Sequence, residues 1–238
     1  MLNDYIAVDL EMTGLDAKKD RILEIGAVRV KEKRIERTFS RMIRQQEPLD
    51  ERITALTGIT DQMAASGSEL DTAMSDFQEF AGDLIWIGHS IMQDYKFVRQ
   101  WEVNHRIKRQ CFAVDTLKIA RKCLPELEKK TLDFLCGHFK IIRGARHRAL
   151  EDALAAQVLY ETLEEKFFEK EPGLFAGREL QYRVKRQTPA TPRQKKYLKD
   201  LAEYHNIELD LSAKQLTRSE ASRLTDQIIR QYGKRQVK

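Results

Sequence analysis

The N-terminal residues alternate between apolar and polar positions, which predicts a β-strand over residues 5–11 with two different faces. Asp9 and Glu11 are two residues apart in this strand, so both carboxylates project from the same face near its end. Thr13 and Gly14 then supply a turn. Neighbouring carboxylates repel each other and lose hydration when they are buried. The pair therefore indicates either a strand end in water or a site for a divalent cation.

Four further segments have the hydrophobic pattern of strands. Residues 22–30 and 38–43 flank a charged hairpin turn at 31–34, so the first three strands are predicted to be antiparallel. Residues 84–88 form a nearly continuous apolar run, which is typical of a strand buried on both faces, and residues 112–115 form a short further strand. Because helical patterns separate the later strands, the sequence predicts an α/β fold with a mixed five-stranded sheet flanked by helices.

The helices are predicted from a 3.6-residue period and from their capping residues. Ser68 as N-cap, with Asp71 in the reciprocal position, opens a helix that ends near residue 81, and Asp115 caps the helix after the last strand. A long helix is predicted over residues 149–168, and its inward residues are expected to be Leu150, Ala153, Leu154, Val158 and Leu163. Shorter helices are predicted over residues 49–56, 91–101 and 131–139.

The C-terminal third differs in composition from the rest. Residues 169–190 contain several Pro and Gly residues, which predicts a linker between a domain over 1–168 and a small basic helical module over 191–238. Thr191 and Pro192 open the first helix of the module. Thr217 to Glu220 is a capping box for the second.

Charge is unevenly distributed along the chain. From Arg178 onward there are 15 Lys and Arg against 7 Asp and Glu, whereas residues 1–177 carry 27 against 30. An acidic body with a basic tail suits a metal-dependent enzyme that acts on a polyanion, and it is also usual for a solvated helical module. No apolar run reaches membrane-spanning length, and the three cysteines lack Cys-x-x-Cys spacing. We therefore expect a cytoplasmic protein with reduced thiols and no membrane partner.

The acidic residues fall where strands end. Asp9 and Glu11 end the first strand, Asp94 follows the buried strand, and Asp152 lies in the first turn of the long helix. The carboxyl ends of parallel strands converge on one edge of a sheet, and four carboxylates there suit Mg²⁺ or Mn²⁺ better than zinc. His147 precedes Asp152 by five residues, which on a continuous helix places them about 140° apart. His147 must therefore lie on the preceding loop in order to face the site.

Three segments resemble the motifs of the DEDDh 3′→5′ exonucleases, a family with a ribonuclease H-like fold. These segments are residues 8–15, 88–94 and 147–152, and the resemblance spans about residues 4–165. Residues 56–60 and 115–117 are most similar to the epsilon subunit of bacterial DNA polymerase III, whereas residues 9–14 and 90–94 are similar to oligoribonuclease. Ser90 and Gln93 depart from the epsilon pattern. This departure leaves Asp94 in place and leaves the choice between DNA and RNA open.

The resemblance implies a role for each motif residue. Two divalent cations, Mg²⁺ or Mn²⁺, would be bound by Asp9, Glu11, Asp94 and Asp152. His147 would deprotonate the attacking water, a task that suits a side chain titrating near neutral pH; the alternative is a surface histidine. The residues expected to border the terminal nucleotide are Met12, Thr13, Leu15 and His89, although core packing explains Met12 and Leu15 almost equally well.

The leading hypothesis is metal-dependent 3′→5′ hydrolysis of single-stranded nucleic acid, with DNA favoured and nucleoside 5′-monophosphates as products. The alternatives are an RNA-trimming or oligoribonuclease-like enzyme and a non-catalytic protein that binds nucleic acid or a polymerase. The expected partners are 3′ ends of single-stranded DNA or RNA, and a DNA polymerase. Basic residues of the C-terminal region would grip the strand backbone or form a solvated face: Lys185, Arg186, Arg193, Lys195, Lys196 and Lys199.

Overall fold

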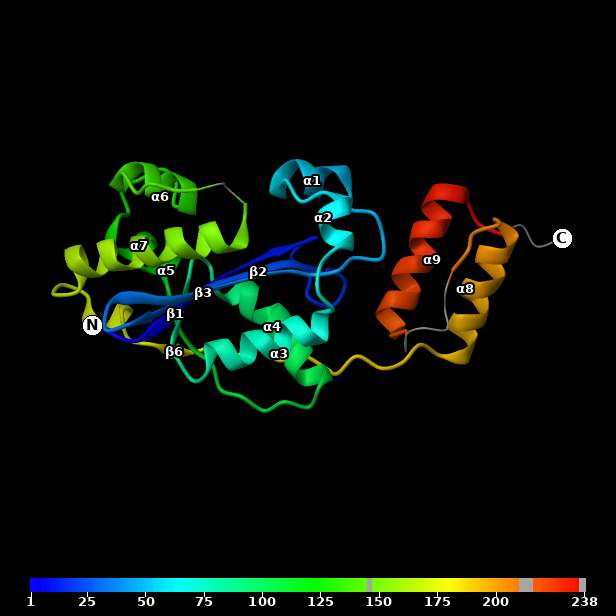
Figure 1. Ribbon diagram of the computed structural model, residues 1–238, viewed down its shortest axis with the longest axis horizontal. Helices are drawn as coiled ribbons and strands as arrows, with labels where there is room; N and C mark the ends of the chain where they lie inside the picture. The colour runs from blue at the N-terminus through cyan, green and yellow to red at the C-terminus, as the bar shows by residue number, and fades with distance from the viewer. Residues whose placement is uncertain (145–146, 210–215, 236–238) are drawn as a thin grey trace.

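The computed structural model describes residues 1–144, 147–209 and 216–235. Its centre is a mixed sheet of six strands in the order β3-β2-β1-β4-β5-β6 (Figure 1). β1 (Tyr5–Met12), β2 (Ile22–Lys31) and β3 (Arg34–Met42) are antiparallel, as predicted. β4 (Trp86–Gly88) and β5 (Phe112–Asp115) run parallel to β1. The last strand, β6 (Arg178–Glu179), pairs antiparallel with β5.

The helices cover both faces of this sheet. α3 (Leu70–Ala81) and α4 (Met92–Asn104) lie on one face, and α5 (Thr116–Cys123), α6 (Leu132–Phe139) and α7 (Ala149–Phe167) lie on the other (Figure 1). Two short helices, α1 (Glu51–Thr57) and α2 (Asp61–Ala65), follow β3, and a 3₁₀ turn spans Pro172–Leu174. The C-terminal helices are α8 (Pro192–Tyr204) and α9 (Arg218–Tyr232).

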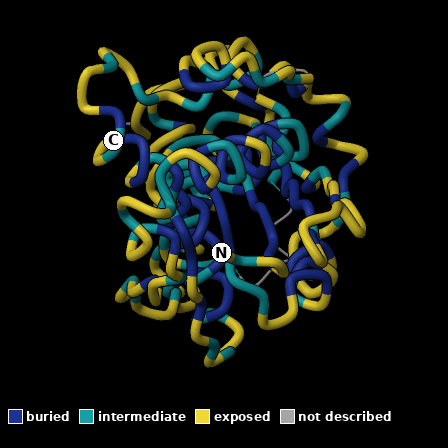
Figure 2. The backbone as a smooth tube through the Cα atoms, turned by 90° about the vertical axis from the view of Figure 1, so that its left-hand side faces the viewer, coloured by how far each residue is buried: buried dark blue, intermediate teal, exposed yellow. Residues whose placement is uncertain are grey.

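Both faces of β1 are buried, which explains the central place of this strand. Ile6 and Val8 pack with α3 and α4, whereas Tyr5 and Ala7 pack beneath α7, and all four side chains are fully buried. The buried segments run through the middle of the molecule beneath exposed loops (Figure 2). The face that carries Asp9 and Glu11 is therefore covered by a helix, so the carboxylates do not sit on a strand end that faces water.

Several predicted details are wrong, each for a tertiary reason. Ser68 does not cap α3: the N-cap is Glu69, without a side-chain capping bond, and Asp71 instead accepts a hydrogen bond from Trp101 Nε1 at 2.8 Å. Val158 of α7 is exposed, because Ala149, Ala153, Ala156, Leu159, Tyr160 and Leu163 form the buried stripe. The sheet gains a sixth strand, β6, whose two residues are too few to show an alternation.

The segment predicted as a linker packs in part on the body. Phe175 and Leu180 are buried in the two main cores, and β6 lies between them. Ala145 and Arg146, and residues 210–215 and 236–238 of the predicted module, lie outside the described residues. Among the described residues, no helix is long and apolar enough to cross a membrane.

α8 and α9 form a separate helical pair, which we call the C-terminal module. Its small core contains Leu198, Leu201 and Ile228. Capping boxes open both helices, Thr191 with Gln194 in α8 and Thr217 with Glu220 in α9, and the second confirms a prediction. These local bonds satisfy backbone N–H groups that the short helices cannot satisfy themselves.

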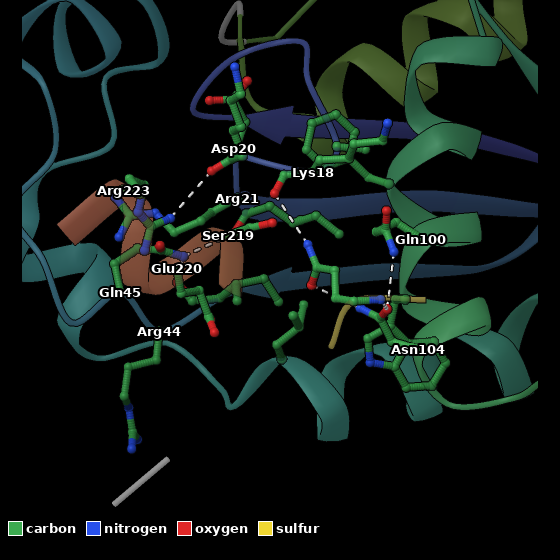
Figure 3. A pocket seen from close by; sticks show the side chains of 18 residues that line it. Lys18, Asp20, Arg21, Arg44, Gln45, Gln100, Asn104, Ser219, Glu220 and Arg223 are labelled. Atoms are coloured by element: carbon green, nitrogen blue, oxygen red, sulfur yellow. Dashed lines mark hydrogen bonds between the residues drawn. The ribbon is translucent and has the colours of Figure 1, made fainter. Parts of the chain in front are cut away.

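The module contacts the body through a few polar side chains. Arg223 of α9 bonds Glu47 at 3.0 Å, and the same carboxylate accepts a bond from Arg21 at 3.1 Å. Gln187, before α8, receives a bond from Asn104 of α4 at 3.1 Å and donates to the Lys18 carbonyl at 3.2 Å. A pocket of about 190 Å³ lies between these contacts (Figure 3), and its cationic lining residues are Lys18, Lys19, Arg21, Arg44 and Arg223.

Candidate active site

Two acidic residues of the site come from the end of the central strand. Asp9 is half-buried and Glu11 is buried near the C-terminal end of β1, just before an irregularity in its pairing with β2. Asp94 lies in the first turn of α4 and is also buried. Its Oδ1 accepts a hydrogen bond from the backbone N–H of Leu10 at 3.0 Å. This bond holds the Asp94 carboxylate beside β1, the strand that carries Asp9 and Glu11.

The N-terminus of α7 approaches the sheet very closely because β2 carries a glycine. A Cβ on Gly26 would lie 2.1 Å from the carbonyl carbon of Ala149. Beside it, the buried carboxylate of Glu24 accepts bonds from Arg148 Nε at 3.0 Å, from Arg148 Nη2 at 2.9 Å and from the Ala149 N–H at 3.2 Å. Glu24 therefore acts as a cap for α7 that is supplied by a strand more than a hundred residues earlier.

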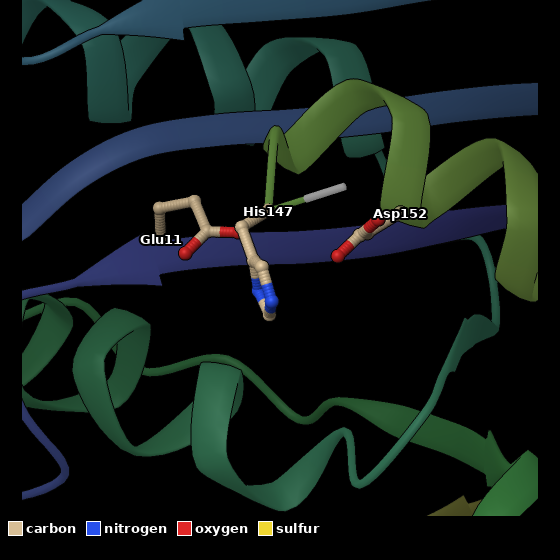
Figure 4. Close-up of side chains that lie close together, drawn as sticks. All are labelled: Glu11, His147 and Asp152. Carbon is tan, nitrogen blue, oxygen red and sulfur yellow. The ribbon is translucent and has the colours of Figure 1, made fainter. Parts of the chain in front are cut away.

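Because α7 is anchored here, the third motif (residues 147–152) lies close to the first (residues 8–15). One ligand atom from each of Glu11, His147 and Asp152 lies within 4.8 Å of the other two (Figure 4). His147 is exposed, has a φ of 55°, and precedes the first residue of α7 by two positions. Its predicted place on a loop before the helix is confirmed. Asp152, one turn into α7, is buried.

The acidic side chains of the site are crowded together in a poorly hydrated place, which disfavours their ionised forms. Burial raises the pKa of Asp9 well above its ordinary value, and the charges of Asp94, Asp152 and Glu11 raise it further. Burial also raises the pKa of Glu11 to about 8, with Asp152 as the next cause. Asp94, again mainly through burial, has a pKa raised to about 7. The ionised forms of these groups are therefore unfavourable by themselves, and a bound cation would stabilise them.

The donor set fits a hard divalent cation. Glu11 and Asp152 offer carboxylate oxygens, and His147 offers an imidazole nitrogen. Asp9 lies close enough to Glu11, Asp94 and Asp152 for their charges to raise its pKa. Carboxylate oxygens are the ligands that Mg²⁺ and Mn²⁺ prefer, whereas the three cysteines are free and lie elsewhere in the described chain. The cluster is thus a candidate metal centre.

The second motif is held by bonds to its neighbours. Both ring nitrogens of His89 are engaged, Nδ1 with Thr116 Oγ1 at 2.9 Å and Nε2 with the Lys130 carbonyl at 2.8 Å, and burial lowers its pKa. Ser90 has a φ of 68°, and its N–H donates to Asp115 Oδ1 at 3.0 Å. Asp115 also caps α5 through the Leu117 N–H, which confirms its predicted structural role. A contact of His89 with substrate would therefore have to use the face of the imidazole ring, since both of its nitrogens already have partners.

The remaining predicted substrate residues lie directly after Glu11. Met12 is partly buried against the core, whereas Leu15 is 69% exposed. The Thr13 hydroxyl accepts a bond from the Arg21 N–H at 2.9 Å, and the Thr13 N–H donates to the Arg21 carbonyl at 2.9 Å. Thr13 therefore closes the loop that Leu15 projects from. A nucleotide-binding role for these three residues and for His89 stays a prediction.

Sequence reasoning missed the residues that position the site. Glu24 is a lone acid within the apolar run of β2, and that oddity was the available signal. Arg143 has no comparable signal. Its side chain is only 10% exposed and contacts Asp152 through Nη2 and Asp133 through Nη1, the latter at 2.8 Å.

Comparison with known proteins defines the class of protein. Residues 6–160 match the family model described as an exonuclease, so the chain is a nuclease by class and belongs to this exonuclease family. It is 36% identical to the DNA polymerase III subunit epsilon of Aquifex aeolicus over 166 residues, which are 69% of this chain and 82% of that protein. It is 31% identical over 166 residues to the PolC-type DNA polymerase III of Caldanaerobacter subterraneus, but spans only 12% of that protein's length.

The solved structures agree with the ribonuclease H-like fold. Exonuclease I of E. coli bound to single-stranded DNA superposes with a TM-score of 0.63 at 17% identity, covering 73% of this chain and 42% of that one. Exonuclease X in complex with 5′ overhanging duplex DNA gives 0.57 at 20% identity, covering 72% and 99%. The predicted resemblance to the epsilon branch is thereby confirmed by sequence, and the α/β fold by structure.

Proposed function

We propose that this protein is a metal-dependent 3′→5′ exonuclease that removes nucleoside 5′-monophosphates from single-stranded nucleic acid, with DNA as the favoured substrate. The observation that carries the proposal is the meeting of Glu11, His147 and Asp152 within 4.8 Å in a chain of the exonuclease family. The preference for DNA rests on the similarity to the epsilon subunit. On the same ground, a DNA polymerase is the proposed protein partner.

Each residue has a task that follows from its position. Two divalent cations, Mg²⁺ or Mn²⁺, when bound, would neutralise the phosphate and favour ionisation of the attacking water. Glu11 and Asp152 would hold them from opposite elements, β1 and α7, with Asp9 and Asp94 completing the carboxylate set. Because His147 is exposed beside these ligands, its imidazole can take a proton from an incoming water and release it to solvent.

A product analysis with labelled strands tests the proposal. Single-stranded DNA and RNA of equal sequence, labelled at the 5′ end, are incubated with the full chain in Mg²⁺, Mn²⁺ or EDTA. The expected result is a descending ladder on DNA that requires the metal. A faster ladder on RNA would favour the RNA-trimming alternative. Binding without cleavage in either metal would favour the non-catalytic accessory protein and would refute the catalytic proposal.

In this proposal the C-terminal module extends the surface that contacts the nucleic-acid strand. It lies beyond the end of the sheet at which β1 terminates (Figure 1), and its Arg223 shares Glu47 with Arg21, a residue bonded to Thr13. Cations of the body and the module line the pocket between them (Figure 3). A phosphate backbone that leaves the metal centre along this side would meet positive charge.

Replacing three exposed lysines of α8 tests this role in the full chain. Lys195, Lys196 and Lys199 changed together to alanine should weaken the binding of long strands and flatten its salt dependence by about 0.7 per lost phosphate contact, while short oligonucleotides are cleaved normally. A control that removes two exposed charges instead of three replaces Lys31 and Lys170; Lys31 lies at the opposite end of the sheet from Glu11. If the salt dependence of strand binding is unchanged, the module does not contact the phosphate backbone, and a role in binding another protein would be favoured instead.

A further inference from the structure

Arg143 lies inside the carboxylate cluster, where no motif predicts a cation. It belongs to the segment between α6 and α7. Its guanidinium contacts Asp152, a proposed metal ligand, through Nη2, and contacts Asp133 in the first turn of α6 through Nη1 at 2.8 Å. One planar side chain thus joins two carboxylates on two different helices, a geometry that the fork of arginine allows and the single ammonium of lysine does not.

The guanidinium is enclosed rather than solvated. Its side chain is 10% exposed, and the Asp152 side chain that it contacts is 11% exposed. Its Nε is buried and has no hydrogen-bond partner among the described residues, so two carboxylate contacts hold the group in place. The Arg143 charge also acts on Asp9, another acid of the same group. Arg143 therefore offsets part of the repulsion among the acids.

A metal ion and this guanidinium are competitors for the same carboxylate. A divalent cation held by Glu11 and Asp152 would stand at close range to a fixed positive charge, and two like charges in a poorly hydrated place repel strongly. The contact with Asp133 would still hold the guanidinium at the edge of the site after its contact with Asp152 is lost.

We propose that Arg143 is the internal counter-ion of the metal centre: it neutralises Asp152 while no cation is bound and leaves Asp152 for Asp133 when the cation enters. This inference rests on the metal centre of the proposed function. Arg143 is a positioning residue here, since it acts through Asp152. Its charge holds α7 against α6 in the metal-free protein and sets how tightly the first cation binds.

Calorimetric titration of the full-length chain with Mn²⁺ tests the inference without reference to hydrolysis. Arg143→Met and Arg143→Gln remove the charge, Arg143→Lys retains it, and Arg121→Met removes an exposed charge of α5 as the matched control. Both neutral variants should bind Mn²⁺ at least about tenfold more tightly than wild type, a difference of about 1.4 kcal/mol. Arg143→Lys should bind Mn²⁺ with an affinity between those of wild type and the neutral variants, because it keeps the charge but cannot contact both carboxylates at once. Arg121→Met should stay within about twofold of wild type.

Thermal unfolding provides the second measurement. In EDTA the neutral variants should melt below wild type, because the acids lose their counter-ion, and Mn²⁺ should raise their Tm by more than it raises that of wild type. Equal or weaker Mn²⁺ binding by both neutral variants would overturn the inference and leave Arg143 as a brace between helices. Failure of both to fold even in Mn²⁺ would overturn it too. Absence of Mn²⁺ binding by wild type would instead remove the metal centre itself, and with it the proposed function.

Discussion

Replacing Gly26 with alanine tests whether the site depends on the close approach of α7 to the sheet. The added Cβ would lie 2.1 Å from the Ala149 carbonyl carbon, 2.2 Å from the Leu150 nitrogen and 2.3 Å from the Ala149 oxygen. All three atoms are backbone, so no side-chain rotation relieves the overlap. Ordinary contact begins at 3.4 Å, and the start of α7 must therefore retreat by about 1 Å.

This retreat would move Asp152 and His147 away from Glu11 together. A misplacement of about 1 Å in a catalytic group can cost about 10²-fold in rate, so we expect a loss of this order in turnover. Overpacking of this kind costs about 1–3 kcal/mol, which lowers the Tm of a chain of this size by several degrees. The rate should therefore fall far more than the folded fraction at assay temperature.

The assay compares metal-dependent cleavage of a labelled single strand, Mn²⁺ affinity and Tm for Gly26→Ala and wild type. The matched control is Gly173→Ala, since a Cβ at Gly173 would meet nothing within 4 Å. The control should keep wild-type values for all three. Full turnover by Gly26→Ala, with or without a lower Tm, would refute the reasoning, because the site would then tolerate the displacement of α7.

Three further predictions concern the charges of the site. Asp9→Ala should abolish hydrolysis in Mg²⁺ and Mn²⁺ without lowering the Tm in EDTA, because it removes a carboxylate that its acidic neighbours repel. Residual activity would contradict the assignment of Asp9 as a metal ligand. His147→Ala should lower kcat by about 10²–10⁴-fold with little change in strand affinity, and a collapse of binding with normal kcat would make His147 a substrate-positioning group. The metal-free protein should lose stability between pH 4.5 and about 8, because folded Glu11 keeps its proton up to about pH 8 whereas the unfolded chain loses it near 4.5. Thermal unfolding in EDTA should therefore give a Tm that falls as the pH rises across this range, and a rising Tm would contradict the prediction. Mg²⁺ should make the Tm less dependent on pH.

Local sequence was a good guide where the interacting groups are neighbours in the chain. The capping box of Thr217 and Glu220, and the cap that Asp115 provides for α5, each join groups at most three residues apart. The hairpin between β2 and β3 turns at Glu32 and Lys33, both with positive φ, inside the predicted segment. Such features depend on backbone geometry that a few residues settle among themselves.

Local signals failed where a distant group competed for the same atoms. Asp71 has the spacing of a capping residue, but the indole of Trp101 takes its carboxylate, and α3 begins without a side-chain cap. The strand β6 exists because the β5 edge pairs with it, since two residues carry no pattern of their own. Val158 has a buried type of side chain but lies on the solvent side of α7.

The sequence by itself was enough to predict which acids form the candidate site and which element carries each one. Asp9 and Glu11 are two apart on a strand, and the spacing of His147 from Asp152 places the histidine before the helix. Only the tertiary structure decided how these groups are held. Glu24 caps α7 across 125 residues, Gly26 admits the α7 backbone, and Arg143 reaches Asp152 from a loop. These contacts exist only after the chain has folded, because burial removes the water that would otherwise separate the charges.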